Sequence, residues 1–263
     1  MKKINLIFTL LLFLSFTVLL YPQDKDDLAK KSQNPISNMI SLPLQNNTSF
    51  NVGPYNRTQN VLNIQPVWPL SLSPSLNLIT RTIIPVISQP IGESDSKFGI
   101  GDINFTSFFS AADPGKVIWG FGPTFFLPTA SDAFLGSEKW SVGPALVVLT
   151  MPGKWVIGLL ANNVWSFAGK EERSDVNQML LQYFINYNLP GGWYLTSGPV
   201  ITANWKAESG QQWTVPFGGG FGKLLKIGSQ PLNAQVQAFA NVVKPDNGAD
   251  WSMRLQLQFL FPK

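Results

Sequence analysis

The sequence predicts an all-β protein, a transmembrane antiparallel up-and-down β-barrel of about 12 strands. Three observations support this prediction. Apolar and polar residues alternate with a period of two through most of the chain after residue 44. Short turns rich in Gly and Pro alternate with longer, more charged connections. Only 13% of the 263 residues are charged while 13% are aromatic, which suits a surface that is apolar on one face and neutral-polar on the other.

The chain begins with an export signal. Lys2 and Lys3 precede an apolar run from Ile4 to Leu20, after which the sequence turns polar. A basic start followed by an apolar run is typical of a secretory signal peptide, which we expect over residues 1–22. An uncleaved anchor helix is the alternative, because about 17 apolar residues is the lower limit for spanning a bilayer.

Residues 23–43 carry a short charged cluster and precede the predicted barrel, which we expect over residues 44–263. The sequence favours a periplasmic tail for residues 23–43. The alternative is a segment that folds into the mouth of the barrel as a partial plug.

A repeat sets the spacing of the barrel strands. Pro114, Pro152 and Pro190 each begin a tight turn that is followed by a tryptophan, and they recur at intervals of 38 residues. A fixed period of this size indicates copies of one supersecondary unit side by side. The strands between the turns are predicted at 44–52, 59–68, 76–87, 100–111, 116–128, 139–150, 154–167, 177–189, 192–205, 212–225, 231–243 and 250–261.

Tryptophan positions indicate which face of the strands meets lipid. Trp155 and Trp165 lie on one face near opposite ends of one strand, and Trp193 and Trp205 repeat this arrangement. Two aromatic girdles separated by an apolar band are typical of membrane barrels. The alternative is a soluble barrel whose core the aromatics fill. The predicted membrane-interface aromatics are Trp119, Trp140, Trp155, Trp165, Trp193 and Trp205.

The opposite face of the strands should line a neutral polar lumen of Asn, Gln, Ser, Thr and Gly side chains. Most charges fall in the long connections, and few occur within strands. Because a charge facing lipid at mid-bilayer costs several kcal/mol, those few should point inward. The candidate lumen and selectivity residues are Arg81, Asp102, Arg254, Gln256 and Gln235, although a satisfied lumen hydrogen bond is the plainer role for each charge.

Prolines within the predicted strands interrupt the expected ladders. The dipeptides Gly122-Pro123, Gly143-Pro144 and Gly198-Pro199 recur in this setting. Proline cannot donate a ladder hydrogen bond, so β-bulges are predicted at these dipeptides.

The composition excludes several kinds of chemistry. With no cysteine and no histidine, the chain cannot form disulfides, thiolate metal sites or a Ser-His-Asp triad. No catalytic residue, metal site or cofactor is predicted. The net charge is +4, but six of the 19 cationic residues precede residue 60, so no nucleic-acid partner is expected.

Several stretches carry a family resemblance: Gly101–Phe105, Trp119–Thr124, Asn204–Ala207 and Trp213–Gly220. They resemble exported bacterial proteins grouped as outer-membrane channels with the meta-pathway phenol-degradation family, some of which carry the label neuromedin U. The resemblance covers most of the mature chain. It implies a transporter-like barrel for aromatic or other hydrophobic compounds. Pro262 and Lys263 displace the terminal aromatic that usually ends such a barrel.

The sequence therefore predicts a Gram-negative outer-membrane channel for passive uptake or efflux of small solutes. Its expected partners are outer-membrane lipid, the barrel-assembly machinery and an unidentified small molecule. A structural or adhesive barrel without transport is the alternative.

Overall fold

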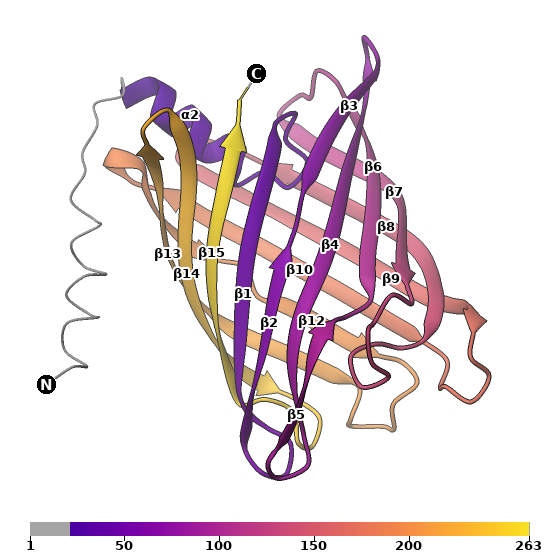
Figure 1. Cartoon of the computed structure of the whole chain (residues 1–263). Helices are drawn as coiled ribbons and strands as arrows, with labels where there is room; N and C mark the ends of the chain where they lie inside the picture. The colour runs from indigo at the N-terminus through magenta and orange to yellow at the C-terminus, as the bar shows by residue number, and fades with distance from the viewer. Residues whose placement is uncertain (1–21, 263) are drawn as a thin grey trace, which may run out of the picture.

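The computed structural model describes residues 22–262 as one closed antiparallel sheet with a short helix at one end (Figure 1). The predicted signal peptide lies outside the described residues, except for Pro22. Among the described residues, no helix has both the length and the apolar character needed to cross a bilayer. In chain order the elements are α2 (Pro22–Ser32), β1 (Ile40–Val52), β2 (Arg57–Ile64), β3 (Val67–Ser73), β4 (Leu76–Ile91), β5 (Asp95–Ile100), β6 (Ile103–Ala111), β7 (Val117–Leu127), β8 (Lys139–Thr150), β9 (Trp155–Gly169), β10 (Asn177–Asn188), η2 (Pro190–Gly192), β11 (Trp193–Ser197), β12 (Val200–Asn204), β13 (Trp213–Ile227), β14 (Gln230–Val243) and β15 (Trp251–Phe261).

The sheet closes on itself because the first strand pairs with the last. β1 and β15 run antiparallel from the Ile40–Phe261 pair to the Phe50–Trp251 pair. Three barrel strands are each interrupted once, so that β2 and β3, β5 and β6, and β11 and β12 are halves of single strands. The barrel therefore has 12 strands, which confirms the predicted fold class.

The predicted bulges at the Gly-Pro dipeptides are wrong. Pro123 pairs directly with Pro144, and the β7–β8 register continues unchanged on both sides of this pair. The register is likewise unshifted across Gly143-Pro144 between β8 and β9 and across Gly198-Pro199 between β10 and its two partners. Each proline omits a ladder hydrogen bond, but the pairs that flank it hold the strands in line.

The glycines of two of these dipeptides explain why the strands stay in register. A Cβ atom on Gly122 would lie 2.0 Å from the carbonyl oxygen of Ser107, and one on Gly143 would lie 1.7 Å from that of Asn163. The neighbouring strand approaches so closely here that only glycine fits. The dipeptides therefore mark close backbone contact rather than an inserted residue.

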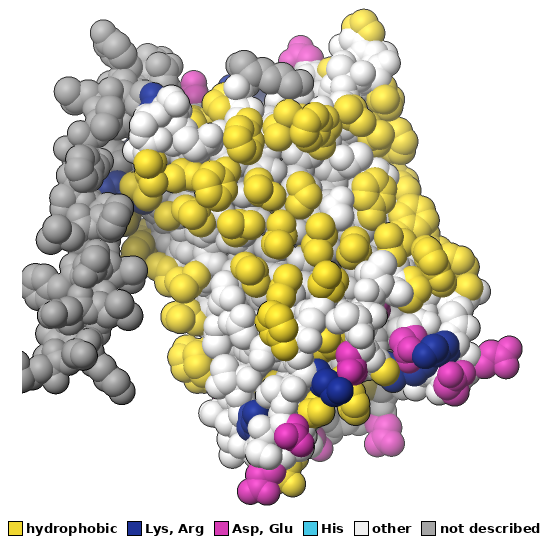
Figure 2. All heavy atoms as spheres, viewed as in Figure 1, with side chains coloured by type: hydrophobic (Ala, Val, Ile, Leu, Met, Phe, Trp, Pro, Cys, Tyr) yellow, Lys and Arg dark blue, Asp and Glu magenta, His cyan; other side chains and the backbone are white. Residues whose placement is uncertain are grey.

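The outer surface of the barrel carries an apolar band. Figure 2 shows hydrophobic side chains across the strands, with charged side chains gathered at the lower rim. All nine tryptophans of the chain are exposed, with exposed fractions from 36% to 53%. A soluble barrel would bury its largest apolar side chains. The exposed tryptophans instead match a barrel whose outer face meets lipid.

The long connections form the charged end of the molecule. The ion pairs of the described residues all lie at this end: Lys97–Asp132, Lys139–Asp175, Lys170–Glu138, Arg173–Glu138, Lys206–Asp175 and Lys244–Asp250. The opposite end has tight turns, and α2 lies across it (Figure 1).

Part of the interior at the tight-turn end is filled by an apolar cluster, which differs from the neutral polar lining that the sequence predicts. The segment Ala145–Leu149 is apolar at every position, so it lacks the alternation that would reveal an inward apolar face. The buried members of the cluster are Ile36, Val67, Ile79, Phe108, Ile118, Ala145, Val147, Leu149, Val156 and Leu160.

Residues 22–39, here called the N-terminal segment, contact this end of the barrel, and the later part of the segment, from Lys31 to Met39, lines the interior. Ile36 is 4% exposed and belongs to the apolar cluster. Gly120 makes room for it, because a Cβ atom there would lie 3.1 Å from the Ile36 Cδ1 atom. Ala29 and Met39 pack with Leu260 in a second buried cluster. The side chains of Gln33 and Asn188 exchange hydrogen bonds of 2.8 and 3.3 Å.

Candidate functional site

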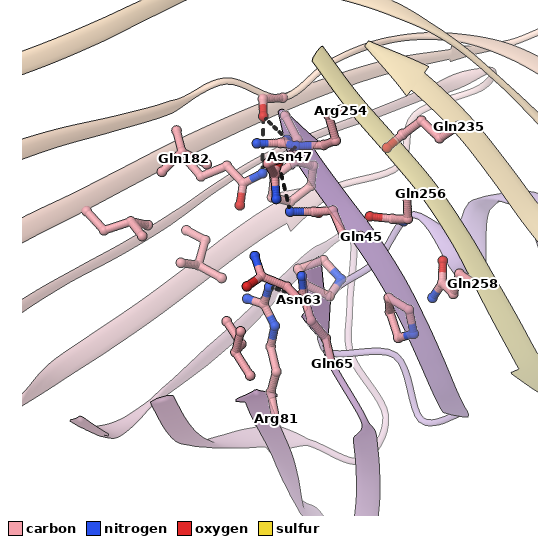
Figure 3. Close-up of a pocket in the computed structure, with 18 of the residues that line it drawn as sticks. Gln45, Asn47, Asn63, Gln65, Arg81, Gln182, Gln235, Arg254, Gln256 and Gln258 are labelled. Atoms are coloured by element: carbon pink, nitrogen blue, oxygen red, sulfur yellow. Dashed lines mark hydrogen bonds between the residues drawn. The ribbon is translucent and has the colours of Figure 1, made fainter. Parts of the chain in front are cut away.

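The barrel encloses a cavity of about 740 Å³. It reaches from Asn34 and Met39 of the N-terminal segment to Ser49 and Asn241 toward the charged end. Its two walls differ in how much apolar surface they carry. Strands β6, β7, β9 and β10 contribute the apolar side chains of Phe108, Phe126, Leu160, Leu180 and Phe184, together with the polar side chains of Asn104, Thr106, Asn162, Gln182 and Asn186. The other wall carries amides from β1, β2, β14, β15 and the residue after β2. They are Gln45, Asn47, Asn63, Gln65, Gln235, Gln256 and Gln258, which Figure 3 labels, and Gln237.

Arg254 lies on β15 with its side chain in the cavity (Figure 3). Its Nε atom donates to the Asn47 side-chain oxygen at 2.9 Å, and one terminal nitrogen donates to the Gly198 carbonyl at 2.8 Å. That carbonyl is free of ladder bonding because β11 and β12 are interrupted at Gly198-Pro199. The guanidinium also lies 5.1 Å from the centre of the Phe239 ring. Arg254 is 8% exposed, so its orientation is fixed by these contacts.

Arg81 lies on β4 and points into the same cavity (Figure 3). One of its terminal nitrogens donates to the Gln65 side-chain oxygen at 2.6 Å. Gln65 is buried at the interruption between β2 and β3, where Pro66 cannot donate a ladder bond. The Gln65 side chain therefore turns toward Arg81 from a position that the broken ladder fixes.

Asp102 also lines the cavity, but its carboxylate is bound to the connection between β7 and β8. It accepts hydrogen bonds from the Ser137 backbone nitrogen at 2.7 Å, the Ser137 hydroxyl at 2.8 Å and the Ala130 backbone nitrogen at 3.2 Å. The pairing of β4 with β5 and β6 shifts by one residue around Asp102. The strand predicted as continuous over 100–111 is thus interrupted where Asp102 anchors a loop.

Gln235 and Gln256 both line the cavity, but only one belongs to a hydrogen-bonded network. Gln235 donates to the Thr196 hydroxyl at 3.3 Å and accepts from Gln237 at 2.9 Å. Within the described chain, the Gln256 side chain makes no hydrogen bond to another protein group, so its amide is free to meet a solute. Tyr194, which donates to Asn233 at 2.7 Å, completes the neighbouring polar wall.

Charge inside the cavity is predominantly positive. Lys31, Arg81 and Arg254 line it together with the single carboxylate of Asp102. Neither arginine forms an ion pair with any carboxylate in residues 22–262. In a partly dry interior, positive charge without a counterion attracts anions strongly. The arrangement can therefore hydrogen-bond polar solutes and hold an anionic group.

The predicted interface aromatics all lie on the outer surface, near strand ends. Trp155 begins β9 and Trp193 begins β11, while Trp205 directly follows β12. Their exposure agrees with a place at the membrane–water boundary, which stays a prediction. The six exposed fractions are 48% for Trp119, 45% for Trp140, 43% for Trp155, 47% for Trp165, 37% for Trp193 and 38% for Trp205.

Sequence reasoning missed the amides that hold the two arginines. Asn47 and Gln65 are not among the predicted lumen residues, although Gln45, Asn47 and Ser49 occupy every second position of their strand. That alternation could have placed Asn47 on the lumen face. No sequence signal shows that Gln65 turns inward, because its position depends on the break at Pro66.

Among residues 22–262, no group of three His, Cys, Asp or Glu side chains could hold a metal ion. Most polar groups that line the cavity are amides, hydroxyls and guanidiniums, which bind solutes through hydrogen bonds and charge.

Comparison with known proteins supports the fold. No family model matches the chain, and no curated protein matches it. A COG4313 outer membrane channel from Pseudomonas putida F1 is structurally similar, with a TM-score of 0.65 and 18% identity over 85% of this chain and 94% of that one. Outer membrane phospholipase A from Escherichia coli has a TM-score of 0.42 and 13% identity over 85% of this chain and 96% of that one. The similarity to the Pseudomonas putida F1 structure shows that the two chains share a fold.

Proposed function

We propose that the chain forms a passive outer-membrane channel for small solutes. The observation that carries this proposal is the polar cavity inside a closed barrel whose outer face is apolar. Eight-stranded barrels are filled by side chains, whereas those of 16–18 strands leave wide aqueous pores. A barrel of 12 strands has room for a narrow route. The channel named in the similar structure from Pseudomonas putida F1 supports this assignment.

The two unlike walls of the cavity favour solutes that have both apolar and polar parts. The half-buried side chains of Phe126, Leu180 and Phe184 offer an apolar surface opposite the amides of β1 and β15. The resemblance to the phenol-degradation family, which implies aromatic or hydrophobic solutes, agrees with this chemistry.

The N-terminal segment is proposed to narrow this route at the tight-turn end. It lines the cavity, and its Ile36 side chain is buried in the interior cluster. This position favours the partial plug over the periplasmic tail. Because β1 begins at Ile40, the segment can be removed without shortening a strand.

Single-channel recording in planar bilayers tests both proposals. The mature chain is refolded and compared with a variant that lacks residues 24–38. We expect small discrete conductance steps in the intact chain and larger steps in the truncated one. Equal steps in both would refute the plug. A folded barrel that shifts its electrophoretic mobility on heating but conducts in neither form would refute the channel and favour the structural alternative.

A further inference from the structure

The arginines Arg81 and Arg254 share one cavity without a carboxylate partner. They come from different strands, β4 and β15, and both point inward (Figure 3). The carboxylate that could neutralise them, that of Asp102, is engaged by Ser137 and Ala130. Holding two like charges in the interior costs free energy unless something of opposite charge joins them.

Most hydrogen-bond donors of the two arginines are unused by protein groups. A guanidinium has about five N–H donors in a planar fork. Among the described residues, Arg254 donates to Asn47 and Gly198, and Arg81 donates to Gln65. Arg81 keeps more free donors than Arg254, and a guanidinium with free donors can bind a carboxylate through two parallel hydrogen bonds.

The surroundings of the arginines select for more than charge. Phe239 lies beside Arg254, and the wall that includes the half-buried Phe126, Leu180 and Phe184 bounds the same cavity. A hydrated inorganic anion would leave this apolar wall without a partner. An anion with an apolar body would cover the wall and place its charge on the arginines. A cavity of about 740 Å³ is within the range of small-molecule sites.

We propose that Arg81 and Arg254 form a binding site for the carboxylate of an amphiphilic organic acid. Gln256 supplies a further amide to the carboxylate, and the apolar wall receives the body of the solute. This inference deepens the proposed channel function, because it names the solute class that the lumen prefers.

Calorimetric titration of the refolded mature chain in a neutral detergent tests the site. The probe is benzoate at pH 7, in a buffer without carboxylate or phosphate and with little chloride. Benzyl alcohol, which has the ring without the charge, and acetate, which has the charge without the ring, are the matched control probes. We expect saturable benzoate binding at least tenfold tighter than that of either control. No benzoate binding, or equal binding of benzyl alcohol, would overturn the proposal.

Variants connect the binding to the two arginines. We expect R81Q and R254Q each to weaken benzoate binding about tenfold and the double variant to abolish saturable binding. K116Q, which removes one positive charge from an exposed tight turn, should bind as the unaltered chain does. R81Q is decisive if R254Q fails to fold, because Arg81 makes one hydrogen bond to a protein group in residues 22–262. Unchanged binding by folded R81Q would overturn the assignment.

The outcomes separate this proposal from the channel itself. Benzoate binding by a barrel that does not conduct would retain the site and refute the channel. Conductance without benzoate binding would retain the channel and refute the site.

Discussion

Replacing Ile36 by alanine should loosen the N-terminal segment while leaving the barrel closed. Ile36 is 4% exposed and packs among side chains from several strands of the barrel interior. Truncation of a buried isoleucine to alanine costs about 2–5 kcal/mol. About 1.4 kcal/mol corresponds to a tenfold change in an equilibrium constant. At the lower value of about 2 kcal/mol, the fraction of molecules whose N-terminal segment is detached from the barrel interior should therefore rise about 30-fold.

Hydrogen-exchange mass spectrometry of residues 27–39 measures this change. We expect faster exchange in the N-terminal segment of I36A and unchanged exchange in the strands that do not contact it. N38A is the matched control, because Asn38 lies two residues away and is exposed. If the N-terminal segment exchanges as slowly in I36A as in the unaltered chain, burial of Ile36 does not hold the segment in place.

Two further changes test the facing of the strands and the charged loops. Leu255 faces outward with 46% exposure, so L255E should lower the free energy of unfolding in lipid by about 1–2 kcal/mol. The control Q256E, at the adjacent lumen position, should lower it less. Equal losses of free energy in urea titrations would contradict the assignment of Leu255 to the lipid face and Gln256 to the lumen. The pKa of Asp132 lies below its ordinary value because the carboxylate accepts a hydrogen bond from the Phe134 backbone and one from Lys97. The ionised carboxylate should therefore stabilise the loop of residues 130–136 fully above the ordinary Asp pKa. This stabilisation should be lost as the pH falls through the lowered pKa of Asp132. Exchange protection of residues 130–136 measured between pH 6 and 3 checks this, and D132N should remove the dependence.

The strand order and the two faces could be predicted because they depend on local patterns. Alternation of apolar and polar residues identifies the lumen face of β14 and β15, and the tight turns locate the strand ends. Contacts between residues far apart in the chain could not be predicted from local sequence patterns. Nothing near Gly143 in the sequence shows that the Asn163 carbonyl approaches it, and that approach replaces the predicted bulge.

The site was predictable only in part for the same reason. Arg81 and Arg254 stood out as rare charges within apolar strands. Their hydrogen-bond partners Gln65 and Asn47 are set by barrel closure and by a break in the ladder. Asp102 was expected to act beside them, but its role depends on a loop that starts more than twenty residues later in the chain.

The pairing of β1 with β15 also constrains how the molecule is made. Of the strands in the described residues, these are the first and the last in chain order, and the Asn47–Arg254 hydrogen bond joins residues 207 positions apart. Contacts over such separations carry a large loop-closure entropy cost, and each of these strands has one unpaired edge until the two meet. An inward-pointing charge on an open edge discourages pairing with other chains. Before β1 and β15 pair, the charge of Arg254 would therefore disfavour aggregation through the open edge of β15. Once they pair, the same side chain lies in the lumen.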